Sequence, residues 1–315
     1  MRLASGHEAL VARVLTRDGR TGFGFDFHLD AAAARRMAEW HAGAGSERPA
    51  CQSALGHPWE TAYVAGAPVD WNAEPAFAQM RWLPEESPML SYKRPDGKSV
   101  NAYLAEPKGG KNAPGMVVIQ EWWGLNDQIR GVADKLAAAG YRALVPDLYR
   151  GKSTVEAKEA EHLMTGLNFG DAAGQDIRGA VQHLKSTGSK KVGVTGFCMG
   201  GALTILSAVN VPEADATVVW YGFPPLEYVD ASKIKAPMLG HFATRDVPFP
   251  IAKVDELEKK LRAANVKFEF HRYDAKHAFA NETANEKKLD MLEYDPKAAE
   301  LAWKRTLDFL AKNLK

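Results

Sequence analysis

One cysteine of the chain stands in a setting that is typical of a nucleophile. Cys198 lies in the segment Gly196-Phe-Cys-Met-Gly200, between a predicted buried strand and a predicted helix. Glycines two positions before and two after a nucleophile permit the sharp strand-to-helix turn that exposes its side chain. The start of a helix favours a thiolate over a thiol, and the N–H of Met199 could stabilise an oxyanion. The alternative is a small cysteine packed inertly in a glycine-rich turn.

A cysteine nucleophile needs a base, and the base needs an acid that orients it. Asp246 follows a predicted strand at residues 236–243, and His277 follows the last predicted strand at residues 266–273. Taken singly, Asp246 could be a turn or helix cap and His277 an exposed loop histidine. Together with the cysteine they give the order nucleophile, acid, base of α/β-hydrolases. Because the C-terminal ends of parallel strands meet at one edge of a sheet, we predict a triad.

Strands and helices alternate from residue 89 onward, which indicates a mostly parallel sheet with helices on both faces. An antiparallel pair is expected around Asp96-Gly97, a dipeptide that favours a hairpin turn. Further strands are expected at residues 116–121, 141–146, 191–197, 216–222, 236–243 and 266–273. Helices are expected at residues 126–139, 171–185, from 198 onward, 251–264 and 296–314. The sequence therefore predicts one α/β domain over residues 89–315.

The first 88 residues differ in composition from the rest of the chain. No lysine occurs before Lys93, whereas tryptophan and proline are frequent up to Pro88. A hairpin is predicted around Asp18-Gly19, followed by a helix at residues 31–41. Residues 44–88 show no sustained period, and we expect them to wrap another surface. A lid over the sheet edge and a dimer contact are the alternatives for this N-terminal extension, residues 1–88.

The composition narrows the classes of function. The 315 residues have a formal net charge of +1, so no excess of basic charge favours nucleic acid as a partner. No apolar stretch approaches the roughly 20 residues that cross a bilayer, and no signal peptide is recognised, so no membrane association is expected. A cytoplasmic protein is predicted. Two cysteines cannot form a disulfide framework for this chain, and Cys51 is interpreted as an incidental thiol.

Several motifs, in order, resemble those of the dienelactone hydrolase family over residues 89–314. They are Gln120-Glu121-Trp122-Trp123-Gly124, Pro146-Asp147-Leu148-Tyr149, Gly196-Phe-Cys-Met-Gly-Gly201, Trp220-Tyr221-Gly222, Asp246, Ala275-Lys-His-Ala-Phe and Trp303-Lys-Arg-Thr-Leu-Asp-Phe. The resemblance implies an α/β-hydrolase fold in which Cys198 is the nucleophile, His277 the base and Asp246 its partner. The implied substrates are small lactones or carboxylic esters, and this chemistry requires no metal and no organic cofactor.

The resemblance also implies roles for residues around the cysteine. Glu121 would take the thiol proton when substrate displaces its carboxylate, because a buried carboxyl group has a raised pKa. Its alternative is a strand-end carboxylate bonded to arginine or to backbone. The Trp122 N–H would be a second oxyanion donor beside that of Met199. Trp123 and Tyr221 are candidate substrate contacts, with plain pocket walls as the alternative for the tryptophan.

One position departs from the family pattern. Lactone-specific members carry an arginine shortly after the base histidine to hold the substrate carboxylate, and this chain has Asn281 there. A bidentate, charge-assisted contact is therefore missing. Asn281 itself is a candidate substrate contact, and Arg245, Arg150 or Lys158 could supply the charge, although each is by default a solvated surface charge. This departure argues against the dienelactone as the substrate, but not against ester or lactone hydrolysis.

Three hypotheses follow for the function. The leading one is a hydrolase of small lactones or esters that works through a cysteinyl acyl-enzyme. The second is a binding or regulatory protein on a hydrolase scaffold, with residues 1–88 as its working surface, since a fold alone does not prove activity. The third is an enzyme with a different reaction, either thioester hydrolysis or acyl transfer.

Overall fold

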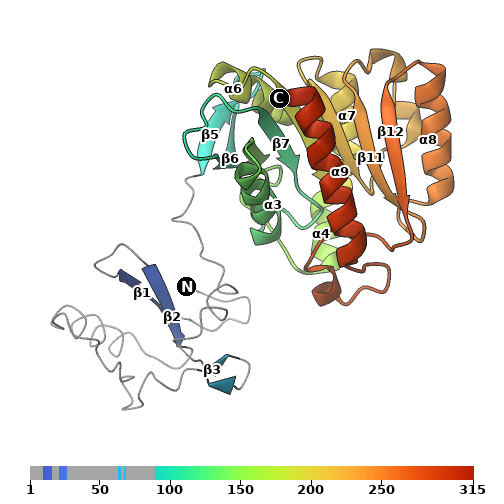
Figure 1. The fold of residues 1–315 in the computed structure, drawn as a ribbon. Helices are drawn as coiled ribbons and strands as arrows, with labels where there is room; N and C mark the ends of the chain where they lie inside the picture. The colour runs from blue at the N-terminus through green and yellow to red at the C-terminus, as the bar shows by residue number, and fades with distance from the viewer. Residues whose placement is uncertain (1–9, 16–20, 27–62, 65–66, 69–88) are drawn as a thin grey trace, which may run out of the picture. The chain divides into compact units, whose positions relative to one another are not determined.

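The computed structural model describes residues 10–15, 21–26, 63–64, 67–68 and 89–315 (Figure 1). The chain divides into two compact units, Met1–Leu83 and Pro84–Lys315.

The described residues of the first unit form two antiparallel strand pairs. β1 (Leu10–Leu15) pairs with β2 (Thr21–Asp26), which confirms the predicted hairpin. β3 (Tyr63–Val64) pairs with β4 (Ala67–Pro68). The helix predicted at residues 31–41, Cys51 and most of the segment 44–88 lie outside the described residues, so the predicted role of this extension stays a prediction.

The second unit is built on one eight-stranded sheet with the order β12-β11-β10-β9-β7-β8-β6-β5. Its strands are β5 (Leu90–Lys93), β6 (Ser99–Ala105), β7 (Gly115–Ile119), β8 (Arg142–Pro146), β9 (Val192–Phe197), β10 (Ala216–Trp220), β11 (Met238–Ala243) and β12 (Phe268–Tyr273). Strands β7 to β12 are parallel to one another, whereas β6 runs antiparallel to both of its neighbours. The mostly parallel sheet predicted from the sequence is confirmed.

Helices connect the parallel strands. They are α3 (Asp127–Ala138), α4 (Ala157–Thr165), α5 (Phe169–Asp171), α6 (Arg178–Ser186), α7 (Met199–Asn210), α8 (Ile251–Ala263) and α9 (Pro296–Leu314). A π-helical segment, η2 (Ala172–Ile177), joins α5 to α6, where the sequence pattern had indicated one continuous α-helix. That prediction was wrong in detail because a π turn shifts the helical register without removing the apolar face that the pattern detects. None of the helices among the described residues is long and apolar enough to span a membrane.

Strand β7 shows how the layers are made. Met116 and Val118 belong to the core that contains α3 and α9, whereas Val117 and Ile119 belong to the core that contains α6 and α7. Figure 1 shows α3 and α9 in front of the sheet and α7 behind it. Alternate residues of a strand point to opposite faces, so a strand covered on both sides is apolar throughout. All five residues of β7 are buried accordingly.

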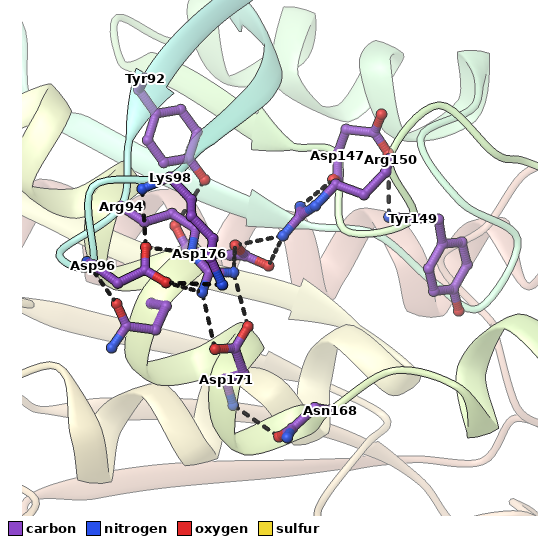
Figure 2. A network of polar contacts seen from close by, with 11 residues as sticks. Tyr92, Arg94, Asp96, Lys98, Asp147, Tyr149, Arg150, Asn168, Asp171 and Asp176 are labelled. Carbon is purple, nitrogen blue, oxygen red and sulfur yellow. Dashed lines mark hydrogen bonds and ion pairs between the residues drawn. The ribbon is translucent and has the colours of Figure 1, made fainter.

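A network of charged side chains around the buried Arg94 and Asp176, here called the Arg94 network, joins the antiparallel edge of the sheet to the π-helical segment (Figure 2). Arg94 follows β5 and forms ion pairs with Asp96, Asp171 and Asp176 at 2.6, 2.8 and 2.9 Å. Arg150, in the loop after β8, binds both oxygens of Asp176 at 2.8 and 2.9 Å. The π-helical segment therefore carries the carboxylate that two arginines share.

Candidate active site

Cys198 sits on a strained turn between β9 and α7. Its φ of 56° and ψ of −117° lie in a region that non-glycine residues rarely adopt. A Cβ on Gly196 would overlap the Gly200 carbonyl group, and a Cβ on Gly200 would come within 2.5 Å of the Ile119 carbonyl oxygen. Only glycine allows these close approaches, so the two glycines permit the turn that carries the half-buried Cys198 side chain.

His277 and Asp246 form a buried hydrogen-bonded pair. His277 Nδ1 lies 2.7 Å from Asp246 Oδ2, and the two side chains are 3% and 1% exposed. The other Asp246 oxygen accepts the N–H of Phe249 at 2.8 Å. The His277 ring stacks on Phe249 and meets the Tyr221 ring edge to face. These contacts hold the imidazole in one orientation.

The environment of His277 favours its protonated form. Burial lowers the pKa of His277, but the charge and hydrogen bond of Cys198, together with those of Asp246, outweigh this and raise it to about 10. An imidazolium beside a cysteine and an aspartate is the arrangement that stabilises a thiolate. Cys198 and Asp246 thus both interact with His277.

Glu121 is buried beside this triad, immediately beyond β7. Its Oε1 accepts the Tyr221 hydroxyl at 3.2 Å, and its Oε2 accepts the Asn281 Nδ2 group at 2.8 Å. Burial raises the pKa of Glu121, and the positive charge of His277 and the two hydrogen bonds only partly offset this rise. Among the described residues, the hydrogen bonds to its two oxygens come from these donors and not from Cys198.

Two backbone amides, those of Met199 and Trp122, are the predicted oxyanion donors. Met199 opens α7, and the first N–H groups of a helix have no partner within the helix. Trp122 follows Glu121 in the loop after β7. Within the described part of the chain, neither amide donates to a protein acceptor. Both remain available to a developing oxyanion.

The structure also places the other residues that the sequence singled out. Trp123 is 1% exposed and packs in the core, with the Lys287 ammonium 4.6 Å from its ring centroid. Tyr221 is buried, has a φ of 35°, and directs its hydroxyl to Glu121. Asn281 is buried and also bonds to Glu121. Tyr221 and Asn281 therefore join the cluster around the cysteine, whereas Trp123 belongs to its packing.

The cationic candidates are engaged elsewhere. Arg245 is about half exposed and pairs with Asp274 at 2.9 Å. Arg150 belongs to the Arg94 network, as Figure 2 shows. Lys158 is exposed on α4. The structure brings none of these three candidates into the hydrogen-bonded cluster around Cys198, which consists of Cys198, His277, Asp246, Glu121, Tyr221 and Asn281.

Sequence reasoning assigned no role to Tyr149, which the structure places beside Cys198. The buried Tyr149 hydroxyl lies 3.2 Å from Met199 Sδ, on the residue that follows Cys198. Burial and the charge of Cys198 both raise the pKa of Tyr149, so its hydroxyl keeps its proton. The signal available in the sequence was its position just after β8, because β8 lies next to β7 in the sheet.

No group of three or more His, Cys, Asp or Glu side chains suited to a metal ion gathers among the described residues.

Comparisons with known proteins agree over this domain. A family model described as the dienelactone hydrolase family matches residues 100–314. Protein usf of Aquifex pyrophilus is 37% identical over 236 residues, covering 72% of this chain and 98% of that protein. A candidate carboxymethylenebutenolidase of Aquifex aeolicus (strain VF5) is 34% identical over 237 residues, covering 72% of this chain and 99% of that protein. The crystal structure of a candidate dienelactone hydrolase from Klebsiella pneumoniae superposes with a TM-score of 0.62 at 28% identity, covering 71% of this chain and 98% of that one.

Proposed function

The chain belongs to the dienelactone hydrolase family and is an ester or lactone hydrolase, and from this premise we propose that it works through a Cys198–His277–Asp246 triad. The intermediate is an acyl group bound to the Cys198 sulfur. The substrates are small lactones or carboxylic esters. The observation that carries the proposal is the continuous set of contacts from Cys198 through His277 to the buried carboxylate of Asp246.

Acylation begins with the thiolate that the His277 imidazolium stabilises. The sulfur attacks the carbonyl carbon of the substrate, and the carbonyl oxygen takes up the negative charge as a tetrahedral oxyanion. The N–H groups of Trp122 and Met199 donate to this oxygen. When the carbon–oxygen bond to the leaving group breaks, His277 gives its proton to the departing oxygen. The result is a thioester on Cys198 and a neutral imidazole.

Deacylation uses the imidazole in the opposite sense. Neutral His277, held in place by Asp246, removes a proton from a water molecule while the water oxygen attacks the thioester carbon. The same two amides stabilise the second oxyanion. Collapse of this intermediate expels the sulfur as a thiolate and releases the carboxylic acid, so that the resting thiolate–imidazolium pair is restored.

Glu121 has a distinct place in this scheme. In the arrangement described, His277 is the better acceptor of the thiol proton, because it interacts with Cys198 directly while Glu121 faces Tyr221 and Asn281. The family resemblance implies that Glu121 accepts the thiol proton when substrate displaces its carboxylate. Its raised pKa suits it to hold that proton. We assign it the second route for forming the thiolate.

The test is the Cys198→Ala variant, assayed with an uncharged aryl ester and a simple lactone. Removing a nucleophile that acts together with its base is expected to lower kcat by roughly 10⁴-fold or more. A mass increase of one acyl group on the wild-type protein, but not on the variant, identifies the acyl-enzyme. Lys304→Ala, which changes an exposed side chain, is the control. Undiminished turnover by folded Cys198→Ala protein overturns the proposed nucleophile.

A further inference from the structure

Asn281 lies four residues beyond His277 and is nearly sealed from solvent, with 2% of its surface exposed. Its side-chain oxygen accepts two hydrogen bonds from Thr283, one from the backbone N–H at 2.9 Å and one from the hydroxyl at 2.8 Å. Its side-chain nitrogen donates to Glu121 Oε2 at 2.8 Å. All of these contacts are internal to the protein.

The contacts with Thr283 determine which way the Asn281 amide faces. A backbone N–H can only donate, so the atom that meets it has to be the amide oxygen. The NH₂ group is then directed to the opposite side, where the Glu121 carboxylate lies. Thr283 therefore selects the Asn281 orientation that presents a donor to Glu121.

The charge of buried Glu121 is stabilised by hydrogen bonds from neutral donors, because none of its bonded partners carries a charge. They are the buried Tyr221 hydroxyl and the Asn281 amide. The Asn281 hydrogen bond opposes the rise in the Glu121 pKa that burial causes. The charge of Glu121 in turn interacts with the charge of His277. Asn281 can thus affect the triad without touching it.

We propose that Asn281, oriented by Thr283, is a positioning residue that holds the Glu121 carboxylate ionised and in place beside the triad, and that it does not contact substrate. The inference rests on the proposed function, since it concerns the thiolate–imidazolium pair of Cys198 and His277. The family resemblance led us to expect a substrate contact at position 281, and the proposal gives this position a different role.

The first experiment compares Asn281→Ala and Asn281→Asp with the wild type. The readouts are the pH profile of kcat/KM for an uncharged aryl ester and the rate of Cys198 alkylation by iodoacetamide. Loss of a donor raises the Glu121 pKa, so Glu121 becomes neutral at a higher pH than in the wild type. Neutral Glu121 no longer stabilises the His277 imidazolium that supports the thiolate, and the acid limb of both profiles therefore moves to higher pH. For Asn281→Ala the expected shift is about 0.5 to 1 pH unit. Asn281→Asp adds a like charge next to Glu121 and is expected to give a larger shift.

Thr283 offers a matched pair of variants that leave Asn281 itself intact. Thr283→Val removes the hydroxyl that helps to orient the amide, whereas Thr283→Ser keeps it. A smaller shift in the same direction is expected for Thr283→Val and none for Thr283→Ser. This pair keeps the inference testable where an Asn281 variant fails to fold.

The decisive control repeats Asn281→Ala in a Glu121→Gln background. If Asn281 acts through Glu121, the shift in the alkylation profile disappears there, and KM stays unchanged in the single variant. A shift that persists without Glu121, or a raised KM with an unmoved acid limb, overturns the inference and indicates a substrate contact. An unaltered profile in folded Asn281→Ala also overturns it, provided that Cys198→Ala is inactive. Full activity of Cys198→Ala would instead overturn the proposed function.

Discussion

Two regions of the molecule bury charge, and they treat it differently. In the Arg94 network, Arg94 meets three carboxylates and Asp176 meets two arginines. In the cluster around Cys198, Glu121 is buried with only neutral donors bonded to it. The buried carboxylate of Asp176 therefore has charged partners, whereas the bonded partners of the buried Glu121 are neutral.

This difference shows in how readily each region exchanges protons. Hydrogen bonds with Asp96 and Asp171 raise the pKa of Arg94 above its already high value, although burial opposes the rise, so Arg94 stays charged at any physiological pH. Burial raises the pKa of Glu121, and that of His277 is raised to about 10. Pairing with opposite charge thus keeps Arg94 and His277 in their charged forms, whereas burial of Glu121 beside neutral donors brings its pKa toward the working range. The comparison therefore predicts that variants of one region change catalysis and variants of the other change stability.

The largest effect is expected from Asp246→Asn, which changes a residue of the cluster around Cys198. Asp246 contributes to the raised pKa of His277, so its neutral replacement lowers that pKa. The alkaline limb of the kcat/KM profile, where the imidazolium loses its proton, should move to lower pH. The rate should fall by roughly 10²- to 10⁴-fold, because the imidazole also loses its orienting partner. Steady-state rates measured across the pH range provide the check.

Asp274→Asn is the matched control for this variant, since it makes the same chemical change on an exposed aspartate. Its profile should coincide with that of the wild type. An alkaline limb that stays in place in Asp246→Asn would contradict the proposed interaction between Asp246 and His277.

The second largest effect is expected from Asp176→Asn, which tests how much the Arg94 network contributes to stability. Asp176 and Arg94 are buried, with 1% and 4% of their side chains exposed. Removing one partner of a buried ion pair typically costs 3 to 5 kcal/mol, and we expect about 3 kcal/mol because Arg94 keeps two other carboxylates. The free energy of unfolding in urea measures this loss. The kcat/KM of the folded variant should stay within about 3-fold of the wild type, since Asp176 touches none of the residues around Cys198 that take part in the proposed chemistry.

A larger fall in kcat/KM for folded Asp176→Asn would show that the two regions are coupled. The path for such coupling would be Arg150, which binds both Asp176 and the Asp147 carbonyl oxygen in the loop that carries Tyr149.

The smallest effect is expected from Arg245→Ala, which sharpens the comparison by probing an exposed charge. Arg245 pairs with Asp274 on the surface, where both side chains are more than half exposed. Such pairs contribute roughly 0 to 1 kcal/mol. Unfolding in urea and kinetics with an uncharged ester should both remain close to wild type. A marked rise in KM would instead make Arg245 a substrate contact.

Much of the fold could be predicted from local patterns. The periodicity of apolar residues placed every strand of the parallel sheet to within two residues, and the helix predicted at residues 296–314 coincides with α9, where the Asp295 side chain accepts the Ala298 N–H. The π-helical segment was missed, because its apolar face has the spacing of an α-helix, and its Asp176 bonds to Arg94, a residue 82 positions away. Local propensity carries no information about such a partner.

The residues of the candidate site likewise divide into those that local sequence patterns predicted and those that they did not. Cys198, Asp246 and His277 could be singled out because each follows a strand in a recognisable order, and parallel strands bring their ends together whatever lies between them. Glu121 and Trp122 came from the family resemblance. Tyr149 was not assigned, and Asn281 was interpreted as a possible substrate contact.

The sequence by itself determined the turn at Cys198 and the alternation of strands and helices, because these depend on short-range sterics and on periodicity along the chain. Apart from the predicted pair of His277 and Asp246, the tertiary structure alone decided which buried charge meets which partner. Glu121 and Asn281 are 160 positions apart, and their hydrogen bond exists only because the sheet brings the loops after β7 and β12 together. The energy of a buried polar group depends on the atoms packed around it, so the roles of Glu121 and Asn281 follow from the fold.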